Sequence, residues 1–549
     1  MPTQEVRSEV LSRPFGSRTK RKKEQRIMVR HGDRTSKKYQ HKMHNMKLKY
    51  LFLALGACII ALTQLSCEPK SDSGWTIDDV EDDPVIEAPK VQANAPLYWT
   101  VYEYCFEAEA SNTNRNMPWD RWVKNVEWVE KNLLPYGYDM VCTDGFMTMY
   151  GDNSCLYMTH YGEENGQKFA LKDLAALCKE HGLRLGVYDN PLWIHCDWNQ
   201  NIPGTKYNVG SLTYQEGVDK VLHPDGKNDI FQWAIPSHPG CKEFIDGFFK
   251  YYSELGVTYI RMDFMCLFET GHGMEDPSNP DTYGRGYGRE EYKLALQYIN
   301  EAALKYGVFT SIVMPNNVNH AELERTYMNM MRAESDAFCG HWAAFSGVEE
   351  GYFDYYKGGT YPRPRGQIDE GRWPHCYNVF DGFVYWSDVT GRGKIILDGD
   401  FTRLTTLNHE KKFNTVDECQ SVISLQLLGG GPIACADQYD SEDIENRVQY
   451  YQNEEMLALN KDGFVGKPLS RDLGKTESQI WVGQMQNGDW VVGLFNREPT
   501  PQSRYLSFAT LTEGEMQVRD LWEHKDLGTM TSISVELAPH ACKVYRLTK

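Results

Sequence analysis

A short phrase recurs along the middle of the chain and narrows the range of folds that the chain can adopt. In each copy a glycine is followed by β-prone residues, and an aspartate stands seven residues after the glycine. The glycine suits the left-handed residue that ends a helix, and the run after it is typical of a buried strand. The aspartate therefore falls where the strand stops. The copies are 137–144, 182–189, 256–263, 393–400 and, less cleanly because it lies in a run of glycines, 430–437.

Helical patterns precede several of these copies. Apolar residues at helical spacing follow Pro118, a residue that suits the first turn of a helix, and a second set runs from Leu171 to Cys178. Further helices are expected at about 240–254, 288–306, 319–331 and 414–428.

Helix, glycine, strand and aspartate in repeated order predict the α/β class. We expect a (β/α)8 TIM barrel over residues 95–466, with the aspartates meeting at one mouth. A doubly wound sheet is the competing architecture. For any single aspartate, capping of the next helix is the alternative to a place in a site.

The sequence changes in character after Asn460. Apolar alternation leads into Asn487-Gly488, a strong signal for a two-residue hairpin turn, and it returns at Ile533, Val535 and Leu537. We therefore expect residues 467–549 to form a small antiparallel β-sandwich domain.

The charge is distributed unevenly. The first 66 residues carry 15 Lys and Arg against 4 Asp and Glu, whereas the remainder carries 43 against 72. A body this acidic would be repelled by phosphate backbones, which argues against a nucleic-acid partner. The aromatic content, 14 Trp, 33 Tyr and 22 Phe, is more typical of sugar-binding clefts than of an ordinary core. No CxxC pair or HExxH motif indicates zinc, so we expect neither a metal nor a cofactor.

Residues 1–66 are interpreted as a basic leader and signal peptide. The segment Tyr50–Leu62 has no charge and is too short to span a bilayer, but it has the length of a signal-peptide apolar region. Cys67 follows it as in a bacterial lipoprotein cleavage site, with Cys58 as a rival and a plain secretory signal as the alternative. Residues 67–94 are interpreted as an acidic tether. We therefore expect an exported protein, a periplasmic or cell-surface lipoprotein of a bacterium, that contacts the membrane only through a lipid at Cys67.

Two carboxylates have an arginine close by in sequence. Arg261 stands two residues before Asp263 on a predicted strand, so both side chains point to one face. A nearby cation lowers the pKa of a carboxyl and keeps it ionised, as a nucleophile requires. Arg332 and Asp336 form a second such pair, four residues apart. Each pair alone could be a structural salt bridge.

Together with other segments, these pairs resemble the melibiase-type glycoside hydrolases, the α-galactosidases of families 27 and 36, and are nearer to family 27. The resemblance covers about residues 95–549, and its motifs come in the family's order. In this chain they read Trp99-Thr-Val-Tyr102-Glu103, Cys142-Thr143-Asp144-Gly145-Phe146, Gly186-Val187-Tyr188, Tyr259-Ile-Arg261-Met-Asp263, Arg332 to Asp336, Leu397-Asp398-Gly399-Asp400-Phe401 and Leu459-Asn460-Lys461-Asp462-Gly463.

The resemblance implies double displacement with retention of configuration. Asp263 would attack the anomeric carbon, and Asp336 would protonate the departing oxygen and then activate water. That scheme needs the carboxyl groups about 5–5.5 Å apart and Asp336 kept protonated. Tyr102 would stack on or wall the sugar ring. The residues that would hold sugar hydroxyls are Asp144, Tyr188, Arg261, Arg332 and Asp400.

The chain departs from the family pattern in three places. Thr143 replaces the first aspartate of the family's pair, which would help bind the C4 and C6 side of galactose. The loop at 314–317 reads Met-Pro-Asn-Asn instead of Cys-Glu-Trp, which leaves the group preferred at C2 open. An aromatic, glycine-rich stretch at 352–373 would either cover the mouth or pack on the barrel.

The sequence thus predicts an exported exo-hydrolase that releases terminal α-galactosyl residues from an oligosaccharide or polysaccharide. The alternatives on the same scaffold are a β-L-arabinopyranosidase and an α-N-acetylgalactosaminidase. Two hypotheses lie outside the glycosidases. The chain could be a non-catalytic glycan-binding lipoprotein or a barrel enzyme of other chemistry.

Overall fold

Eight parallel strands form a closed ring in the computed structural model. They pair in the order β12-β9-β8-β7-β6-β2-β1-β14-β13, and every pairing in this sheet is parallel. The two outer members, β12 and β13, are halves of one strand interrupted at Gly399-Asp400, so the sheet closes on itself. The strands are β1 Leu97–Thr100, β2 Met140–Cys142, β6 Arg184–Tyr188, β7 Val257–Met262, β8 Phe309–Ile312, β9 Met330–Arg332, β12 Ile396–Asp398, β13 Phe401–Thr402 and β14 Ile433–Cys435.

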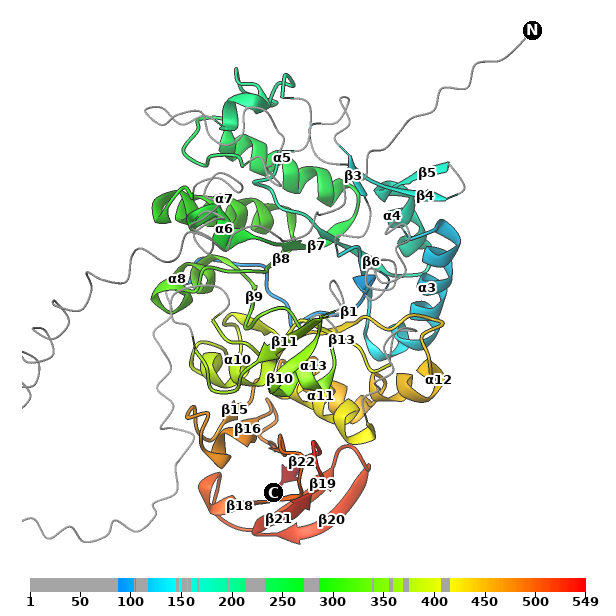
Figure 1. Cartoon of the computed structure of the whole chain (residues 1–549), viewed down its shortest axis with the longest axis vertical. Coiled ribbons are helices and arrows are strands. Elements are labelled where there is room, and N and C mark those ends of the chain that lie inside the picture. The colour runs from blue at the N-terminus through cyan, green and yellow to red at the C-terminus, as the bar shows by residue number, and fades with distance from the viewer. Residues whose placement is uncertain are drawn as a thin grey trace, which may run out of the picture. The chain divides into compact units, whose positions relative to one another are not determined.

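Helices surround this ring (Figure 1). The main ones are α3 Trp119–Asn132, α4 Leu171–Glu180, α5 Cys241–Glu254, α7 Arg289–Tyr306, α8 Val318–Tyr327, α10 Val379–Tyr385, α11 Val416–Leu428 and α13 Glu454–Asp462. Shorter helices are α6 Met265–Thr270, α9 Trp342–Ser346 and α12 Ile444–Arg447. Two small antiparallel sheets lie in the connections, β3 Thr148–Tyr150 with β4 Thr159–Glu164 and β5 Gln167–Ala170, and β10 Val348–Asp354 with β11 Gly359–Arg363.

The structure describes residues 87–102, 104, 117–144, 148–150, 156, 159–164, 167–194, 198–213, 233–270, 286–337, 340–354, 359–368, 375–405 and 415–549. The predicted leader, Cys67 and most of the predicted tether lie outside these ranges. Within them, no helix combines the length and the apolar character needed to cross a membrane.

The recurrent phrase has the predicted local structure. The glycine that opens each of the five copies has a φ between 71° and 100°, a conformation that only glycine adopts without strain. A strand follows each glycine and ends at or just before the aspartate. The (β/α)8 barrel is confirmed, and the doubly wound sheet is excluded because the strands close into a ring.

One helix prediction was too long. The helix expected over 319–331 ends at Tyr327, because Met328 is extended and Met330–Arg332 form β9 between β8 and β12. Pairing on both sides in the barrel decides the structure of this three-residue segment.

The C-terminal part is an antiparallel β structure, as predicted. Its strands are β15 Lys467–Pro468, β16 Ile480–Gln484, β17 Trp490–Phe495, β18 Gln502–Ser507, β19 Met516–Asp520, β20 Lys525–Met530, β21 Ser532–Leu537 and β22 Cys542–Thr548. They form a six-stranded and a two-stranded sheet around an apolar core of their own. The predicted hairpin joins β16 to β17, but Gly488 is left-handed and its N–H bonds to Met485, so the loop has three residues rather than two.

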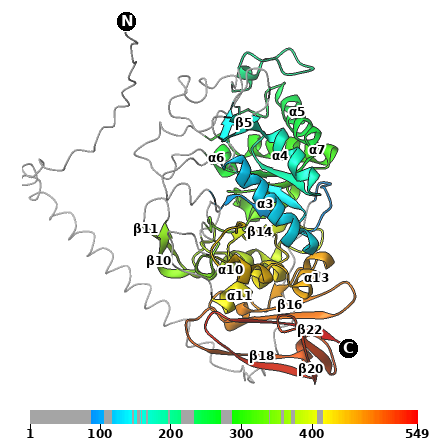
Figure 2. The same ribbon diagram turned by 90° about the vertical axis from the view of Figure 1, so that its right-hand side faces the viewer.

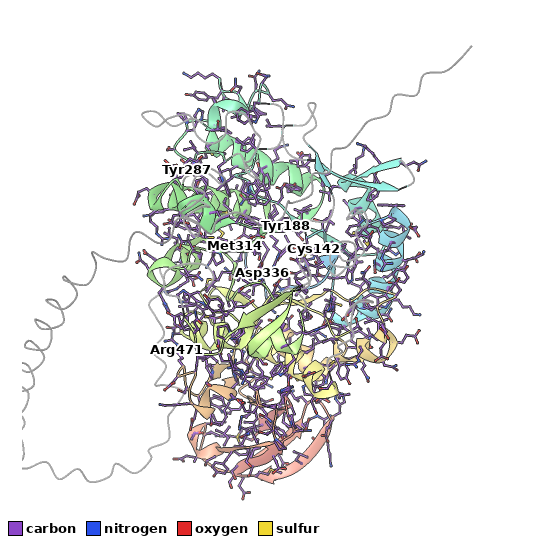
Figure 3. The ribbon with its side chains drawn as sticks, in the orientation of Figure 1. Cys142, Tyr188, Tyr287, Met314, Asp336 and Arg471 are labelled. Carbon is purple, nitrogen blue, oxygen red and sulfur yellow. The ribbon has the colours of Figure 1, made fainter. Side chains whose placement is uncertain are left out.

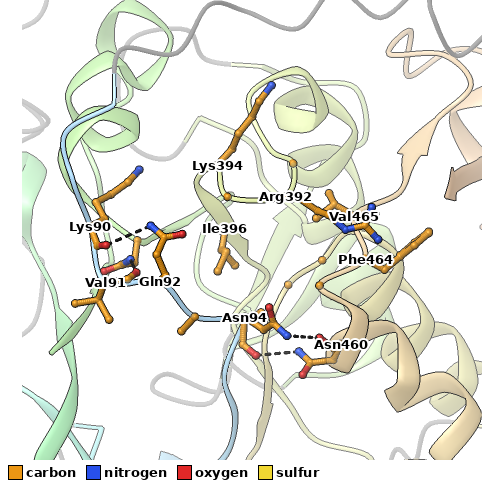
Figure 4. A pocket seen from close by; sticks show the side chains of 18 of the residues that line it. Lys90, Val91, Gln92, Asn94, Arg392, Lys394, Ile396, Asn460, Phe464 and Val465 are labelled. Carbon is orange, nitrogen blue, oxygen red and sulfur yellow. Dashed lines mark hydrogen bonds between the residues drawn. The ribbon is translucent and has the colours of Figure 1, made fainter. Parts of the chain in front are cut away.

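A strap of residues before β1 crosses the end of the barrel opposite the mouth and is tied down by asparagines. The Asn94 amide donates to the carbonyl of Asn460 (2.8 Å), and the Asn460 amide donates back to Ala95 (2.8 Å). Asn329 donates to the Val91 carbonyl at 2.7 Å. A small cavity remains between the strap, Arg392 and the end of α13 (Figure 4). The domain boundaries within the chain stay predictions.

Candidate active site

All of the predicted site residues lie at the carboxyl ends of barrel strands, which meet at one mouth because the strands are parallel. Figure 3 shows Cys142, Tyr188, Met314 and Asp336 gathered in the middle of the barrel from different strands. The predicted residues are Tyr102 after β1, Asp144 after β2, Tyr188 at the end of β6, Arg261 in β7, Asp263 after β7, Arg332 at the end of β9, Asp336 four residues later, and Asp400 between β12 and β13.

Asp263 is held by two hydrogen-bond donors. The Tyr188 hydroxyl donates to its Oδ2 at 2.8 Å, and the Phe264 backbone N–H donates to its Oδ1 at 2.6 Å. Burial and the charge of Asp336 raise the pKa of Asp263 to about 6. Burial and the neighbouring Asp263 carboxylate also raise the pKa of Tyr188, so the phenol keeps its proton and donates it. Both Asp263 oxygens are therefore fixed in direction.

Asp336 is the more accessible carboxylate. Its side chain is 39% exposed, and its Oδ1 accepts a hydrogen bond from Arg332 Nη1 at 3.2 Å. Asp263 follows β7 and Asp336 follows β9, and both strands belong to one parallel ring with β8 between them, so the two carboxylates lie at the same mouth. The expected separation of about 5–5.5 Å stays a prediction. A fixed acid and an accessible acid thus face one opening.

Four residues that follow barrel strands have a left-handed backbone. The φ angle is 43° at Asp144, 61° at Phe264, 47° at Met314 and 65° at Asp400. Non-glycine residues rarely adopt this conformation, and where they do they cluster at functional sites. The backbone therefore points to the same mouth as the charges do.

Beneath the two acids lies a closed network of buried charges. Arg261 donates to Asp398 at 2.6 Å and to Asp400 at 3.2 Å, and its Nε lies 3.4 Å from Asp144. Arg332 donates a hydrogen bond to each carboxylate oxygen of Asp400, at 2.6 and 2.7 Å. Burial opposes ionisation of Asp398, but the two arginines outweigh it and lower the pKa of that carboxyl. Each buried charge of the network is thus paired with a charge of opposite sign.

The structure corrects the expected role of Arg261. Its guanidinium does not pair with Asp263, because it extends across the barrel to the carboxylates between β12 and β13. Asp263 stands beyond the last residue of β7, where Tyr188 and Phe264 bind it. The pKa of Asp263 is accordingly raised, not lowered as the pairing would require. Asp398 is the member of the network that the sequence analysis did not select, although it lies in a segment quoted there.

The residues expected to hold sugar hydroxyls differ in accessibility. Four of them are at most 4% exposed and bonded to one another or to neighbours, namely Asp144, Arg261, Arg332 and Asp400. Tyr188 is half-buried, and so is Tyr102, whose ring lies 4.3 Å from that of Phe401. Their roles toward a sugar stay predictions.

Thr143 and its neighbour Asp144 face the barrel frame. Thr143 is fully buried and its hydroxyl accepts the Tyr188 backbone N–H at 3.3 Å. Asp144 accepts the Thr100 hydroxyl at 2.7 Å and pairs with Arg261. Neither position presents an unpaired carboxylate to the mouth.

The loop after β8 is anchored by buried carboxylates. The Asn316 side chain donates to Glu269 at 2.8 Å, and its backbone N–H donates to Glu324 at 3.1 Å. Within the predicted stretch 352–373, parts of which lie outside the described residues, β10 and β11 form a hairpin that projects from one side of the barrel (Figure 2). Whether this hairpin selects substrates stays a prediction. The described residues contain no cluster of three or more His, Cys, Asp or Glu that could hold a metal ion.

Comparison with known proteins gives three kinds of match. Residues 475–547 match the family described as the alpha galactosidase C-terminal beta sandwich domain. The isomalto-dextranase of Arthrobacter globiformis is 33% identical over 470 residues, which are 82% of this chain and 67% of that protein. An α-galactosidase of Oryza sativa is 30% identical over 138 residues, 24% of this chain and 32% of its own length.

Solved structures also match most of the chain. The isomalto-dextranase of Arthrobacter globiformis T6 complexed with panose has a TM-score of 0.69 at 30% identity, covering 85% of this chain and 76% of that one. A family 27 β-L-arabinopyranosidase from Geobacillus stearothermophilus has a TM-score of 0.59 at 18% identity, covering 83% and 96%. The second likeness concerns the fold alone.

Proposed function

The chain belongs to glycoside hydrolase family 27, the melibiase-type glycoside hydrolases, and from that premise we propose that it is a retaining glycosidase acting on a dextran-type α-glucan. Asp263 is the nucleophile and Asp336 the acid and base. One observation supports these roles. Two carboxylates lie at the same mouth, and the first is held by two hydrogen-bond donors whereas the second is accessible to solvent.

The reaction has two displacements. Asp263 attacks the anomeric carbon and forms an ester while the glycosidic bond breaks, and Asp336 gives its proton to the departing oxygen. Asp336 then takes a proton from water, whose oxygen displaces Asp263 and restores its carboxylate. Asp336 is exposed to solvent, which suits its role because the leaving group departs and water enters on its side of the sugar. The fixed Asp263 suits in-line attack, since its donors orient both oxygens.

The glucan is favoured over a galactoside by two observations. The isomalto-dextranase match extends over 82% of the chain, whereas the rice α-galactosidase match covers 24%. The second concerns the position expected to bind the C4 and C6 side of galactose. There Thr143 accepts a hydrogen bond from the Tyr188 backbone. Its neighbour Asp144 is bonded to Thr100 and Arg261. A site rejects an epimer mainly through polar groups placed for a hydroxyl, and those groups are already paired here. α-Galactoside hydrolysis is the second candidate, favoured by the local match to the rice α-galactosidase.

A substrate panel tests the assignment. Purified protein is incubated with dextran, panose, aryl α-glucoside, aryl α-galactoside and β-L-arabinopyranoside, and released sugars are separated and quantified. We expect turnover of the α-glucosyl substrates at least tenfold above the others. Turnover of the galactoside alone would replace the glucan by the second candidate, and an inverted anomer in the first product would reject the retaining mechanism.

Replacing Tyr188 with phenylalanine tests how Asp263 is tuned. The hydroxyl bond lowers the pKa of Asp263, so its loss should raise that pKa above about 6. The acidic limb of the kcat/KM profile should therefore move to higher pH, and kcat/KM at pH 7 should fall about ten- to a hundredfold. Tyr306→Phe is the control, since it removes a phenol–carboxylate bond to Asp246 outside the mouth. An unmoved acidic limb in Tyr188→Phe would contradict the assignment.

We also propose that the protein is exported and lipid-anchored at Cys67. The support is the apolar segment Tyr50–Leu62 and the cysteine that follows it. Cell fractionation combined with lipid labelling tests this, and a soluble, unlabelled product would reject it.

A further inference from the structure

A second groove lies on the outer wall of the barrel, beside the C-terminal sheet. Its volume is about 640 Å³, within the range of about 300–1,000 Å³ usual for ligand sites. It is lined from α11, α13, the turn after β19 and the short helices η2 Leu134–Tyr136 and η5 Val448–Tyr450. None of the predicted catalytic or sugar-holding residues lines it, so it is distinct from the mouth.

Aromatic side chains form the wall of this groove. The Tyr450 and Trp522 rings lie 6.2 Å apart at an angle of 58°, and Tyr136 lines the groove beside them. The indole N–H of Trp522 donates to the Ser424 hydroxyl at 2.8 Å, which fixes that ring. Rigid rings offer contact area at little entropic cost. Trp522 is only 9% exposed and packs behind the groove, so the apolar faces open to a ligand are the half-buried rings of Tyr450 and Tyr136.

Some polar side chains of the groove are bonded to the surrounding backbone, whereas others have no hydrogen-bond partner within the described residues. Gln452 donates to the Asn132 carbonyl at 2.8 Å, and Asn453 donates to the Leu521 carbonyl at 2.9 Å, so both belong to the framework. The Gln420 carboxamide and the Tyr450 hydroxyl have no hydrogen-bond partner among the described residues. Donors and acceptors therefore remain available next to the aromatic wall.

The charge of the groove favours a neutral ligand over an anionic one. Glu455 is bound by Arg519 at 2.7 Å and by His524 at 2.8 Å, which leaves Glu454 as an unpaired carboxylate within the part of the groove that the structure describes. A phosphate group would find no free cation among the described residues that line the groove, and Glu454 would oppose it. A pyranose has C–H faces that pack on aromatic rings and hydroxyls that bond to amide and phenol groups.

We propose that this groove binds a pyranose unit of the polysaccharide substrate, away from the reacting centre. That the polysaccharide is an α-glucan rests on the proposed function. A second attachment on the same polymer raises the effective concentration of chain ends at the mouth, which helps long substrates and leaves short ones unaffected.

The test compares binding of polymer with turnover of a small substrate. In an Asp263→Asn background, which prevents hydrolysis, affinity electrophoresis through gels containing soluble dextran measures retention of the full chain. We expect Tyr450→Ala and Gln420→Ala each to weaken retention about five- to tenfold. Tyr505→Ala, which removes a 60% exposed tyrosine on β18 outside the groove, should leave retention unchanged. With Asp263 intact, all three variants should hydrolyse aryl α-glucoside like the parent.

The outcomes separate the two proposals. If the parent hydrolyses α-glucosides and binds dextran, while Tyr450→Ala and Gln420→Ala bind dextran equally well, the groove proposal is overturned alone. A parallel loss of aryl α-glucoside turnover also overturns it, since the effect would then be on the mouth or the fold. A parent without any α-glucoside turnover overturns the proposed function instead. Concentration-dependent self-association lost in Tyr450→Ala, without dextran binding, would assign the groove to a second copy of the chain.

Discussion

Replacing Asp263 with alanine should reduce turnover of an aryl α-glucoside by a factor on the order of 10⁴–10⁶. The variant has no carboxylate to form the ester, and Asp336 lies on the leaving-group side in the proposed mechanism, where it cannot take over the attack. Steady-state kinetics at pH 7 measure the loss. Asp263→Asn should be as inactive, because an amide oxygen is a poor nucleophile.

The fold should survive the loss of the Asp263 carboxylate. The folded-state pKa of Asp263 is about 6 against the usual 3.8, so the native protein holds this proton more tightly than the unfolded chain does. The contribution of Asp263 to stability is therefore fully present below pH 4 and is lost as the pH rises through 6. At pH 7–8 the ionised Asp263 costs stability. Asp263→Asn should consequently melt no lower than the parent at pH 7.5, and a lower melting temperature would contradict the raised pKa.

Azide distinguishes the two acids by the anomer that forms. With α-glucosyl fluoride, azide should displace fluoride directly in Asp263→Ala and give the β-glucosyl azide by a single inversion. In Asp336→Ala, Asp263 still forms the glucosyl ester from this activated donor, and azide then displaces Asp263 to give the α-glucosyl azide. Interchanged anomers would interchange the roles of Asp263 and Asp336.

The sequence could locate elements whose signals are local. Each copy of the glycine–strand–aspartate phrase combines a helix end, a buried strand and a strand end within eight residues, and all five copies form barrel strands. Strand β9 carries no such phrase. Its residues Met330 and Met331 suit a helix as well as a strand, and pairing with β8 and β12, which are distant in sequence, decides between them.

The partners of the site residues could not be predicted in the same way. The two-residue spacing predicts that Arg261 and Asp263 share a face of β7, but Asp263 lies beyond the end of that strand, and an arginine side chain reaches several strands of a narrow barrel. Its choice of Asp398 and Asp400 depends on how β7 and β12 are placed across the ring. That placement is a property of the closed barrel and leaves no trace in the local spacing of charges.

Replacing Arg261 with methionine should destabilise the protein by about 3–5 kcal/mol at pH 7.5. Arg261 is 3% exposed and is the shared partner of Asp144, Asp398 and Asp400, so its loss leaves buried carboxylates with one cation fewer. Arg261→Lys keeps the charge but offers a single ammonium in place of a fork of donors, and its cost should be smaller. Thermal and urea unfolding of the full chain measure both variants.

An exposed arginine provides the matched control. Arg519 also binds two carboxylates, Glu455 and Asp526, but its side chain is 35% exposed. Solvent screens those pairs, so Arg519→Met should cost much less stability than Arg261→Met. Equal losses in Arg261→Met and Arg519→Met would show that burial does not set the strength of the network.

The pH dependence of Arg261→Met shows whether uncompensated charge causes the loss. The arginines hold the pKa of Asp398 below its usual value, so removal of Arg261 should raise that pKa and let the buried carboxyl take up a proton as the pH falls. The difference in stability between the parent and Arg261→Met should therefore narrow between pH 7.5 and pH 5, because protonation removes the buried negative charge. A difference that stays constant over this interval would assign the loss to packing of the arginine stem, since packing does not titrate.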